Sequence, residues 1–188
     1  MDAKQALGTV RAGAATNGIG SNRIGMWGFS ADGHLTALLG TQFDGGDRDA
    51  TDPTDKVSSR PDFLILSYAL ITFSASGATH AGSTSSLLGD SPTAEQRDAV
   101  SDELHVTTET PPSFLFATTD DQTVPVTNCV LFYRSLIEHH VAEELHLFQH
   151  GLHGAALAKN DPELSLWTTL LLHWLAANKW DSTTLANP

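Results

Sequence analysis

Short apolar runs alternate with longer segments whose apolar residues recur at helical spacing along most of this chain. Runs bounded by glycine, proline, serine or aspartate are typical of strands. Strands are predicted at Arg23–Phe29, Asp62–Ala69, Ser113–Thr119 and Glu144–Gln149. Helices are predicted at Ala3–Ala15, Ala31–Leu39, Pro92–Ser101, Val126–His140 and Pro162–Lys179. The alternation predicts an α/β fold, in which helices flank a parallel sheet of about four strands.

Two segments between these elements lack either periodicity. Thr41–Arg60 is rich in Asp, Gly, Thr and Ser, and Thr72–Ser91 is rich in Ser, Thr and Gly. Both are interpreted as long loops beside a site rather than as a second domain. With no internal repeat in the chain, we expect residues 1–188 to form a single domain.

Composition and charge exclude several classes of partner. The 188 residues are 40% hydrophobic and 17% charged, which is enough to bury one core. A formal net charge of −12 argues against binding to nucleic acid and to anionic membrane surfaces. No stretch is long and apolar enough to cross a bilayer, and the first seven residues lack the apolar core of a signal peptide. We expect a soluble protein and assign no compartment.

Neither a disulfide nor a metal site is predicted. Cys129 is the one cysteine of the sequence, so it has no intramolecular partner, and its position on a predicted helix suggests a buried thiol. His139, His140, His146 and His150 lie close together in sequence but without the spacing of a zinc site. We therefore expect no metal and no cofactor.

A serine lies between the first predicted strand and the helix that follows it. Gly28-Phe29-Ser30 matches the start of the G-x-S-x-G turn, in which a strained serine lies at the top of a parallel sheet. The last position of the pattern is Asp32, and the next glycine is Gly33. A helix-cap serine is the alternative interpretation. Ser30 is thus a candidate nucleophile that requires partners elsewhere.

Those partners follow in the order Ser, Asp, His that α/β-hydrolases use. Asp121 comes directly after the predicted strand Ser113–Thr119 and is the candidate orienting carboxylate, with its neighbour Asp120 as a competitor. His153 lies in a glycine-flanked loop after the last strand and is the candidate base. His150 competes with it for that role.

With these residues in place, the chain resembles the bacterial acetylxylan-esterase-like carboxylesterases of the α/β-hydrolase superfamily. The resemblance implies a Ser30, Asp121, His153 triad and an oxyanion contact from the backbone N–H of Ala31. The matching segments keep their order along almost the whole chain. They are Arg23-Ile24-Gly25, Gly28-Phe29-Ser30-Ala31, Arg60-Pro61-Asp62-Phe63, Leu87-Leu88-Gly89, Pro111-Pro112-Ser113-Phe114, Asp121–Pro125 and His153-Gly154.

The matched region corresponds to the C-terminal half of the family's fold, so we expect a truncated α/β-hydrolase fold. The strands that precede the serine strand in the family, and the His-Gly-Gly loop that donates an oxyanion hydrogen bond, have no counterpart in this chain. Strand 23–29, which is central in relatives, is then expected to have an unpaired edge. Two such edges pairing antiparallel across a two-fold axis predict a homodimer. A strand swap between chains, or an N-terminal part of the fold outside this sequence, would also satisfy the edge.

The predicted function is a serine carboxylesterase that hydrolyses short-chain acyl esters, acetyl esters above all, through an acyl-enzyme. Acetylated carbohydrate is one candidate substrate, and slow turnover is expected without the second oxyanion donor. Phe29, Asp32, His34 and His80 are candidate pocket residues. The alternative is a weak or inactive α/β-hydrolase remnant that serves assembly or binding.

Overall fold

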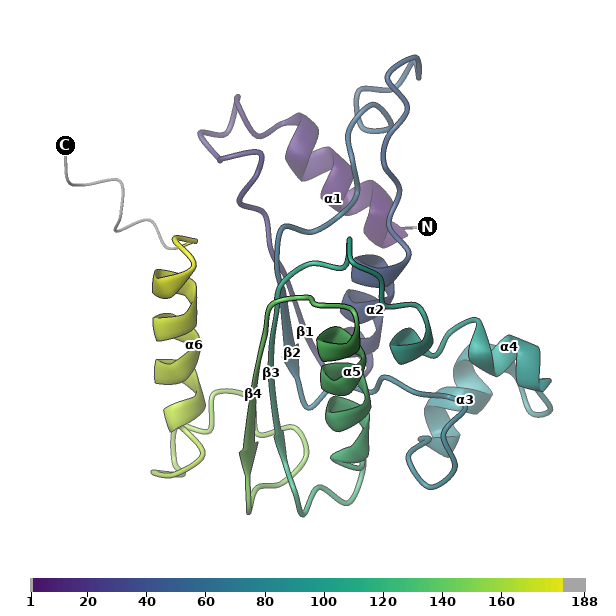
Figure 1. The fold of residues 1–188 in the computed structure, drawn as a ribbon, viewed down its shortest axis with the longest axis vertical. Coiled ribbons are helices and arrows are strands. Elements are labelled where there is room, and N and C mark those ends of the chain that lie inside the picture. The colour runs from purple at the N-terminus through teal and green to yellow at the C-terminus, as the bar shows by residue number, and fades with distance from the viewer. Residues whose placement is uncertain (1, 181–188) are drawn as a thin grey trace.

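Four parallel strands form the centre of the molecule and lie side by side in their order along the chain (Figure 1). A computed structural model describes residues 2–180. The strands are β1 (Met26–Phe29), β2 (Leu64–Ser67), β3 (Ser113–Thr118) and β4 (Glu143–Phe148). Phe29 is paired with Ser67, and Ser67 with Phe116, so neighbouring strands end at one edge of the sheet. The predicted four-stranded parallel sheet is confirmed.

Helices cover both faces of the sheet, as Figure 1 shows with α6 on one side and α2 and α5 on the other. The helices are α1 (Asp2–Ala12), α2 (Ser30–Thr41), α3 (Ala81–Leu88), α4 (Ala94–Asp98), α5 (Thr127–Glu138) and α6 (Leu166–Ala177). A 3-10 turn, η1 (Asp102–Leu104), follows α4. Connections between neighbouring parallel strands must cross from one end of the sheet to the other and are usually helical.

The alternation of side chains along β2 and β3 divides the core into two layers. Leu64 and Leu66 face α2 and α5, and they pack with Phe132 of α5. Ile65 points the other way and packs beneath α6. There the ring of Phe116 stacks on Trp167, with ring centroids 4.1 Å apart. Both central strands are buried along their whole length, which explains why apolar residues predominate in their sequences.

The helix predictions were wrong in several places, and α6 begins at Leu166 instead of Pro162. Helix α3 lies inside the segment Thr72–Ser91, which was interpreted as a loop because Ser, Thr and Gly are weak helix formers. Its first turn is capped by an unusual residue, since Nδ1 of His80 accepts a hydrogen bond from the N–H of Ser83. Helix α1 ends at Ala12 instead of Ala15, and α4 forms only the middle of the predicted helix Pro92–Ser101.

Strands β1 and β4 form the two edges of the sheet. The N–H of Met26 donates to the carbonyl of Phe63 at the start of β2. Successive residues of a strand direct their backbone groups to opposite sides, so those of Trp27, the next residue, face away from β2. The expected edge is therefore present in the described residues, and the homodimer through it stays a prediction. On β4 the half-buried side chains include Glu143, Glu144 and His146. Charged side chains on an edge strand disfavour pairing with another chain.

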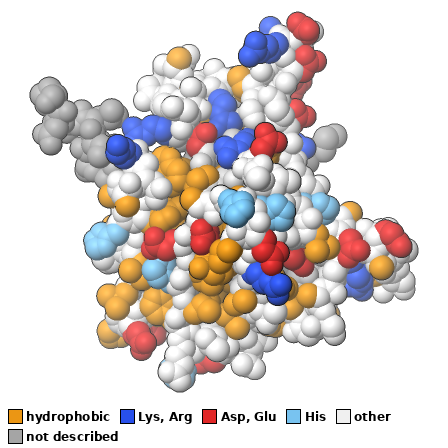
Figure 2. All heavy atoms as spheres, viewed as in Figure 1, with side chains coloured by type: hydrophobic (Ala, Val, Ile, Leu, Met, Phe, Trp, Pro, Cys, Tyr) orange, Lys and Arg blue, Asp and Glu red, His pale blue; other side chains and the backbone are white. Residues whose placement is uncertain are grey.

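The surface is divided between acidic and apolar regions (Figure 2). Acidic side chains gather at the tip of the loop between α2 and β2 and again near α3 and α4. Apolar side chains gather over β4 between α5 and α6. Across residues 2–180, none of the helices has both the length and the apolar character that a bilayer crossing requires.

Candidate active site

Ser30 occupies the turn where β1 becomes α2. Its φ of +52° lies in the left-handed region, which non-glycine residues rarely adopt and which costs about 1–3 kcal/mol. The preceding Phe29 is extended, with φ −114° and ψ 138°, so the backbone reverses direction within one residue. The N-cap position of α2 is Phe29, and the hydroxyl of Ser30 contacts Nε2 of His153. The helix-cap alternative for Ser30 is therefore wrong.

The glycines beside Ser30 are required by close backbone approaches. A Cβ atom on Gly28 would lie 2.1 Å from the carbonyl oxygen of Asp32, and one on Gly33 would lie 2.4 Å from Cβ of Ala69. Gly33 thus provides the close contact between α2 and the chain after β2, one position later than in the usual pattern. Asp32 itself is exposed, which explains why a carboxylate is accommodated there.

Three side chains predicted from the sequence form a continuous chain of hydrogen bonds. Ser30 Oγ lies 2.8 Å from Nε2 of His153, and Nδ1 of His153 lies 2.7 Å from Oδ2 of Asp121. The side chain of Asp121 is 1% exposed, while that of His153 is 18% exposed. When Nδ1 donates to the carboxylate, Nε2 keeps a lone pair that accepts the hydroxyl proton of Ser30.

Asp121 is itself held in place by the turn that follows β3. Its Oδ1 accepts hydrogen bonds from the backbone N–H groups of Thr123 at 2.8 Å and Val124 at 3.0 Å. One carboxylate oxygen therefore fixes the turn and the other faces the imidazole. The competitor Asp120 points elsewhere, and its Oδ2 lies 2.9 Å from Nδ1 of His150. The two residues that competed for the roles of Asp121 and His153 are paired with each other.

Tyr68 contributes to this site and was missed by the sequence predictions. Its ring packs edge-on against the imidazole of His153, with centroids 5.0 Å apart, and its hydroxyl accepts a hydrogen bond from the N–H of Ala156. Its φ of +39° is a second strained conformation at the sheet edge. Burial raises the pKa of the Tyr68 hydroxyl. Its position directly after β2 could have indicated this role, because residues that follow parallel strands lie together at the carboxyl edge of the sheet.

A cavity of about 640 Å³ lies beside the first turn of α2 and is bounded on its other side by α3. Ala31, Asp32, His34 and His80 line it, together with apolar side chains such as Leu70. Four of the residues singled out from the sequence therefore border one space. Phe29 does not line this cavity, because its ring packs against Tyr68 and Trp27.

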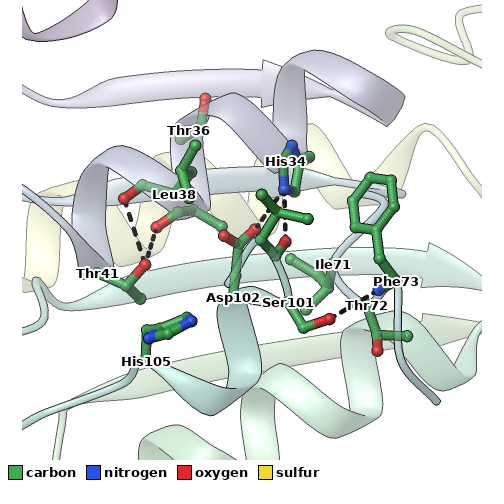
Figure 3. Close-up of polar contacts among 12 residues, drawn as sticks. His34, Thr36, Leu38, Thr41, Ile71, Thr72, Phe73, Ser101, Asp102 and His105 are labelled. Atoms are coloured by element: carbon green, nitrogen blue, oxygen red, sulfur yellow. Dashed lines mark hydrogen bonds and ion pairs between the residues drawn. The ribbon is translucent and has the colours of Figure 1, made fainter. Parts of the chain in front are cut away.

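His34 lies one turn after Ser30 on α2, and its imidazole contacts the segment that contains Asp102 (Figure 3). Its Nε2 lies 2.8 Å from the carbonyl oxygen of Val100 and 3.8 Å from Oδ2 of Asp102. Burial lowers the pKa of His34, and burial together with the charge of Glu103 raises the pKa of Asp102 well above its ordinary value. His34 is thus neutral near pH 7, and its Nε2–H donates to the carbonyl of Val100, while Asp102 holds its proton more tightly than an exposed carboxyl does.

Neither a reactive thiol nor a group of metal ligands is found among the described residues. Cys129 is buried, which confirms the prediction of a buried thiol, and desolvation raises the pKa of that thiol to about 12. Among residues 2–180, no group of three or more His, Cys, Asp or Glu side chains is placed to hold a metal ion.

Comparison with known proteins places this geometry in a family. The model of the BD-FAE family matches residues 1–136, a range that contains Ser30 and Asp121 and ends before His153. The chain belongs to the BD-FAE family. It has the α/β-hydrolase fold, and a solved acetyl ester-xyloside bifunctional hydrolase from Caldicellulosiruptor lactoaceticus superposes on it with a TM-score of 0.92 at 42% identity. That alignment covers 95% of this chain and 65% of the solved one.

Two curated relatives of this BD-FAE chain act on xylan, according to their names. The endo-1,4-beta-xylanase B of Butyrivibrio fibrisolvens is 36% identical over 167 residues, which is 89% of this chain and 26% of that protein. An acetylxylan esterase of Xylanibacter ruminicola is 28% identical over 162 residues, which is 81% of this chain and 30% of that protein. The BD-FAE chain thus spans less than a third of the length of either curated relative.

Proposed function

We propose that this BD-FAE chain is a serine carboxylesterase that hydrolyses short-chain acyl esters, with acetylated carbohydrate as its substrate class. One observation carries the proposal, namely the hydrogen-bonded series Ser30, His153, Asp121 at the carboxyl edge of the sheet. A nucleophile, a base within reach of it and a buried acid behind the base are the three parts that acyl transfer requires.

In the proposed reaction Ser30 Oγ attacks the ester carbonyl carbon while His153 Nε2 takes the hydroxyl proton. The C–O bond to the alcohol then breaks, and the proton passes from His153 to the departing alkoxide. Water repeats the sequence on the acyl-serine: His153 takes a proton from it, the carboxylic acid leaves and Ser30 regains its proton. Asp121 holds the imidazole in the required tautomer and stabilises its cationic form through the 2.7 Å contact.

We assign to the backbone N–H of Ala31 the hydrogen bond that stabilises the negative charge on the carbonyl oxygen. This group lies in the first turn of α2, where N–H groups have no partner within the helix and the helix dipole favours an anion. The loss of one of two such donors costs on the order of 100- to 1000-fold in turnover. With Ala31 as the one assigned donor, we expect slow hydrolysis.

The relatives support the acetyl ester as the substrate class. The solved hydrolase with a TM-score of 0.92 is named for an acetyl ester activity, and one curated relative is named an acetylxylan esterase. The cavity beside Ala31 gives room for the rest of a substrate, and its lining combines apolar side chains with the imidazoles of His34 and His80. Neutral sugar esters carry no charge that the acidic surface would repel.

Hydrolysis of p-nitrophenyl acetate by wild type and by Ser30→Ala tests the proposal. We expect kcat to fall by about 1000-fold or more in Ser30→Ala, because removal of a triad nucleophile leaves only binding and oxyanion contacts. Ser85→Ala is the matched control, since Ser85 is an exposed serine on α3 whose hydroxyl bonds Asp90. Equal rates in wild type and Ser30→Ala would reject the esterase and favour an inactive remnant that serves assembly or binding.

A further inference from the structure

Two consecutive aspartates after β3 bind two histidines of a single loop. Asp121 holds His153 at 2.7 Å, and Asp120 holds His150 through a contact of 2.9 Å between Oδ2 and Nδ1. The other oxygen of Asp120, Oδ1, accepts a hydrogen bond of 2.9 Å from the N–H of Gly151. Asp120 therefore contacts the loop at two consecutive residues, His150 and Gly151, and Gly151 lies two residues before His153.

Gly151 is held on its other side as well. Its carbonyl oxygen accepts a 2.8 Å hydrogen bond from Oγ1 of Thr118, the last residue of β3. A Cβ atom on Gly151 would lie 2.6 Å from Cγ2 of Thr118 and 2.7 Å from Cδ2 of Leu164, so the backbone packs directly on both side chains. Both polar backbone groups of Gly151 are thus bound by residues at the end of β3.

The two Asp–His pairs differ in their exposure. The inner pair is the less exposed one, with side-chain exposures of 1% for Asp121 and 18% for His153. In the outer pair the values are 47% for Asp120 and 69% for His150. The hydrogen bond from His150 is the main reason why the pKa of Asp120 lies below its ordinary value, so Asp120 is a carboxylate near pH 7. The outer pair lies on the solvent side of the loop and not at the nucleophile.

From these contacts we infer that Asp120 is a positioning residue for the proposed esterase. Its carboxylate fixes His150 and Gly151, and this in turn fixes the loop that places Nε2 of His153 2.8 Å from Ser30 Oγ. The inference rests on the proposed function. A displacement of about 1 Å between reacting groups can cost on the order of 100-fold in rate, so a loop anchor has a measurable effect without touching substrate.

Kinetics of Asp120→Ala and Asp120→Asn with p-nitrophenyl acetate test the inference. We expect kcat to fall tenfold to a hundredfold in Asp120→Ala while KM stays within about twofold, because the base is displaced and the cavity is not. In Asp120→Asn the amide oxygen still accepts from the N–H of Gly151, so most of the rate is retained. Hydrogen exchange of the Gly151 amide should be faster in Asp120→Ala than in Asp120→Asn.

Two controls make the outcome decisive. Asp90→Ala removes another exposed carboxylate that accepts one side-chain hydrogen bond, from Ser85, and should leave both kcat and Gly151 exchange at their wild-type values. Ser30→Ala is assayed in parallel. If Ser30→Ala is inactive and Asp120→Ala keeps the wild-type kcat, positioning by Asp120 is rejected while the esterase stands. If Ser30→Ala is as active as wild type, the proposed function fails, and this inference fails with it.

Discussion

The hydroxyl oxygen of Ser30 lies 2.8 Å from Nε2 of His153, although 123 residues separate the two in sequence. The parallel sheet explains this contact. Ser30 follows β1, Asp121 follows β3 and His153 follows β4, and the carboxyl ends of parallel strands meet at one edge. Strand order brings the three segments together, and the turn or loop after each strand then orients the side chain.

Asp121→Asn should disable the proposed esterase without unfolding it. The amide oxygen still accepts the N–H groups of Thr123 and Val124, while the amide nitrogen cannot accept from Nδ1 of His153. The imidazole then takes the wrong tautomer, and kcat should fall on the order of 10⁴-fold. Steady-state assays with p-nitrophenyl acetate and a thermal melt check both expectations. A kcat within tenfold of wild type would contradict the role assigned to Asp121.

Gly28→Ala should destabilise the turn that carries Ser30. The added Cβ would lie 2.1 Å from the backbone oxygen of Asp32, an atom that moves only if α2 moves. We expect the free energy of unfolding in urea to fall by about 1–3 kcal/mol, the range for overpacking. Gly45→Ala is the control, because a Cβ atom on Gly45 would have no neighbour within 4 Å, and an equal effect of both variants would refute the packing argument.

Asp102→Asn should change how stability depends on pH. Asp102 is fully buried, neither carboxylate oxygen has a hydrogen-bond partner among the described residues, and its pKa is raised well above 3.8. The folded chain therefore binds this proton more tightly than the unfolded chain does. Wild-type stability should fall as pH rises from about 3.8 toward the raised pKa, a fall that asparagine lacks.

Urea unfolding across this pH range measures the effect of Asp102→Asn. The stability of the variant relative to wild type should increase as pH rises from about 3.8 toward the raised pKa, because folding of wild type then requires Asp102 to take up a proton. Parallel stability profiles for the two proteins would show that Asp102 does not titrate differently in the folded chain.

The free edge of β1 predicts association in solution. Trp27 is 43% exposed beside backbone groups directed away from β2, and pairing of two such edges would satisfy those groups. Light scattering coupled to size exclusion should give twice the mass of one chain. A monomer at high protein concentration would contradict the predicted homodimer.

The strands and the site residues were predictable because their signals are short in range. The strands are apolar runs that the sheet buries on both faces, and Ser30 and His153 are flanked by glycines. The choice of Asp121 over Asp120 was less determined, since both follow the same strand. In the structure the N–H groups of Thr123 and Val124 bind Oδ1 of Asp121, which leaves Oδ2 directed toward His153.

Other features depend on contacts that no local pattern encodes. Helix α3 forms from weak helix formers, and an imidazole takes the place of the usual capping side chain. Tyr68 resembles the end of an apolar strand in sequence, yet its strained backbone turns the ring onto His153. Asp102 lies in a polar segment that is typical of a surface, and the fold buries it completely.

Reaction with a fluorophosphonate, followed by peptide mapping, tests the central claim most directly, because an activated serine hydroxyl forms a P–O bond and displaces fluoride without requiring the natural ester. We predict one label per chain, attached to Ser30, and labelling that is greatly slowed in His153→Ala. A folded chain that takes up no label at Ser30, or that is labelled there equally fast without His153, would contradict the account.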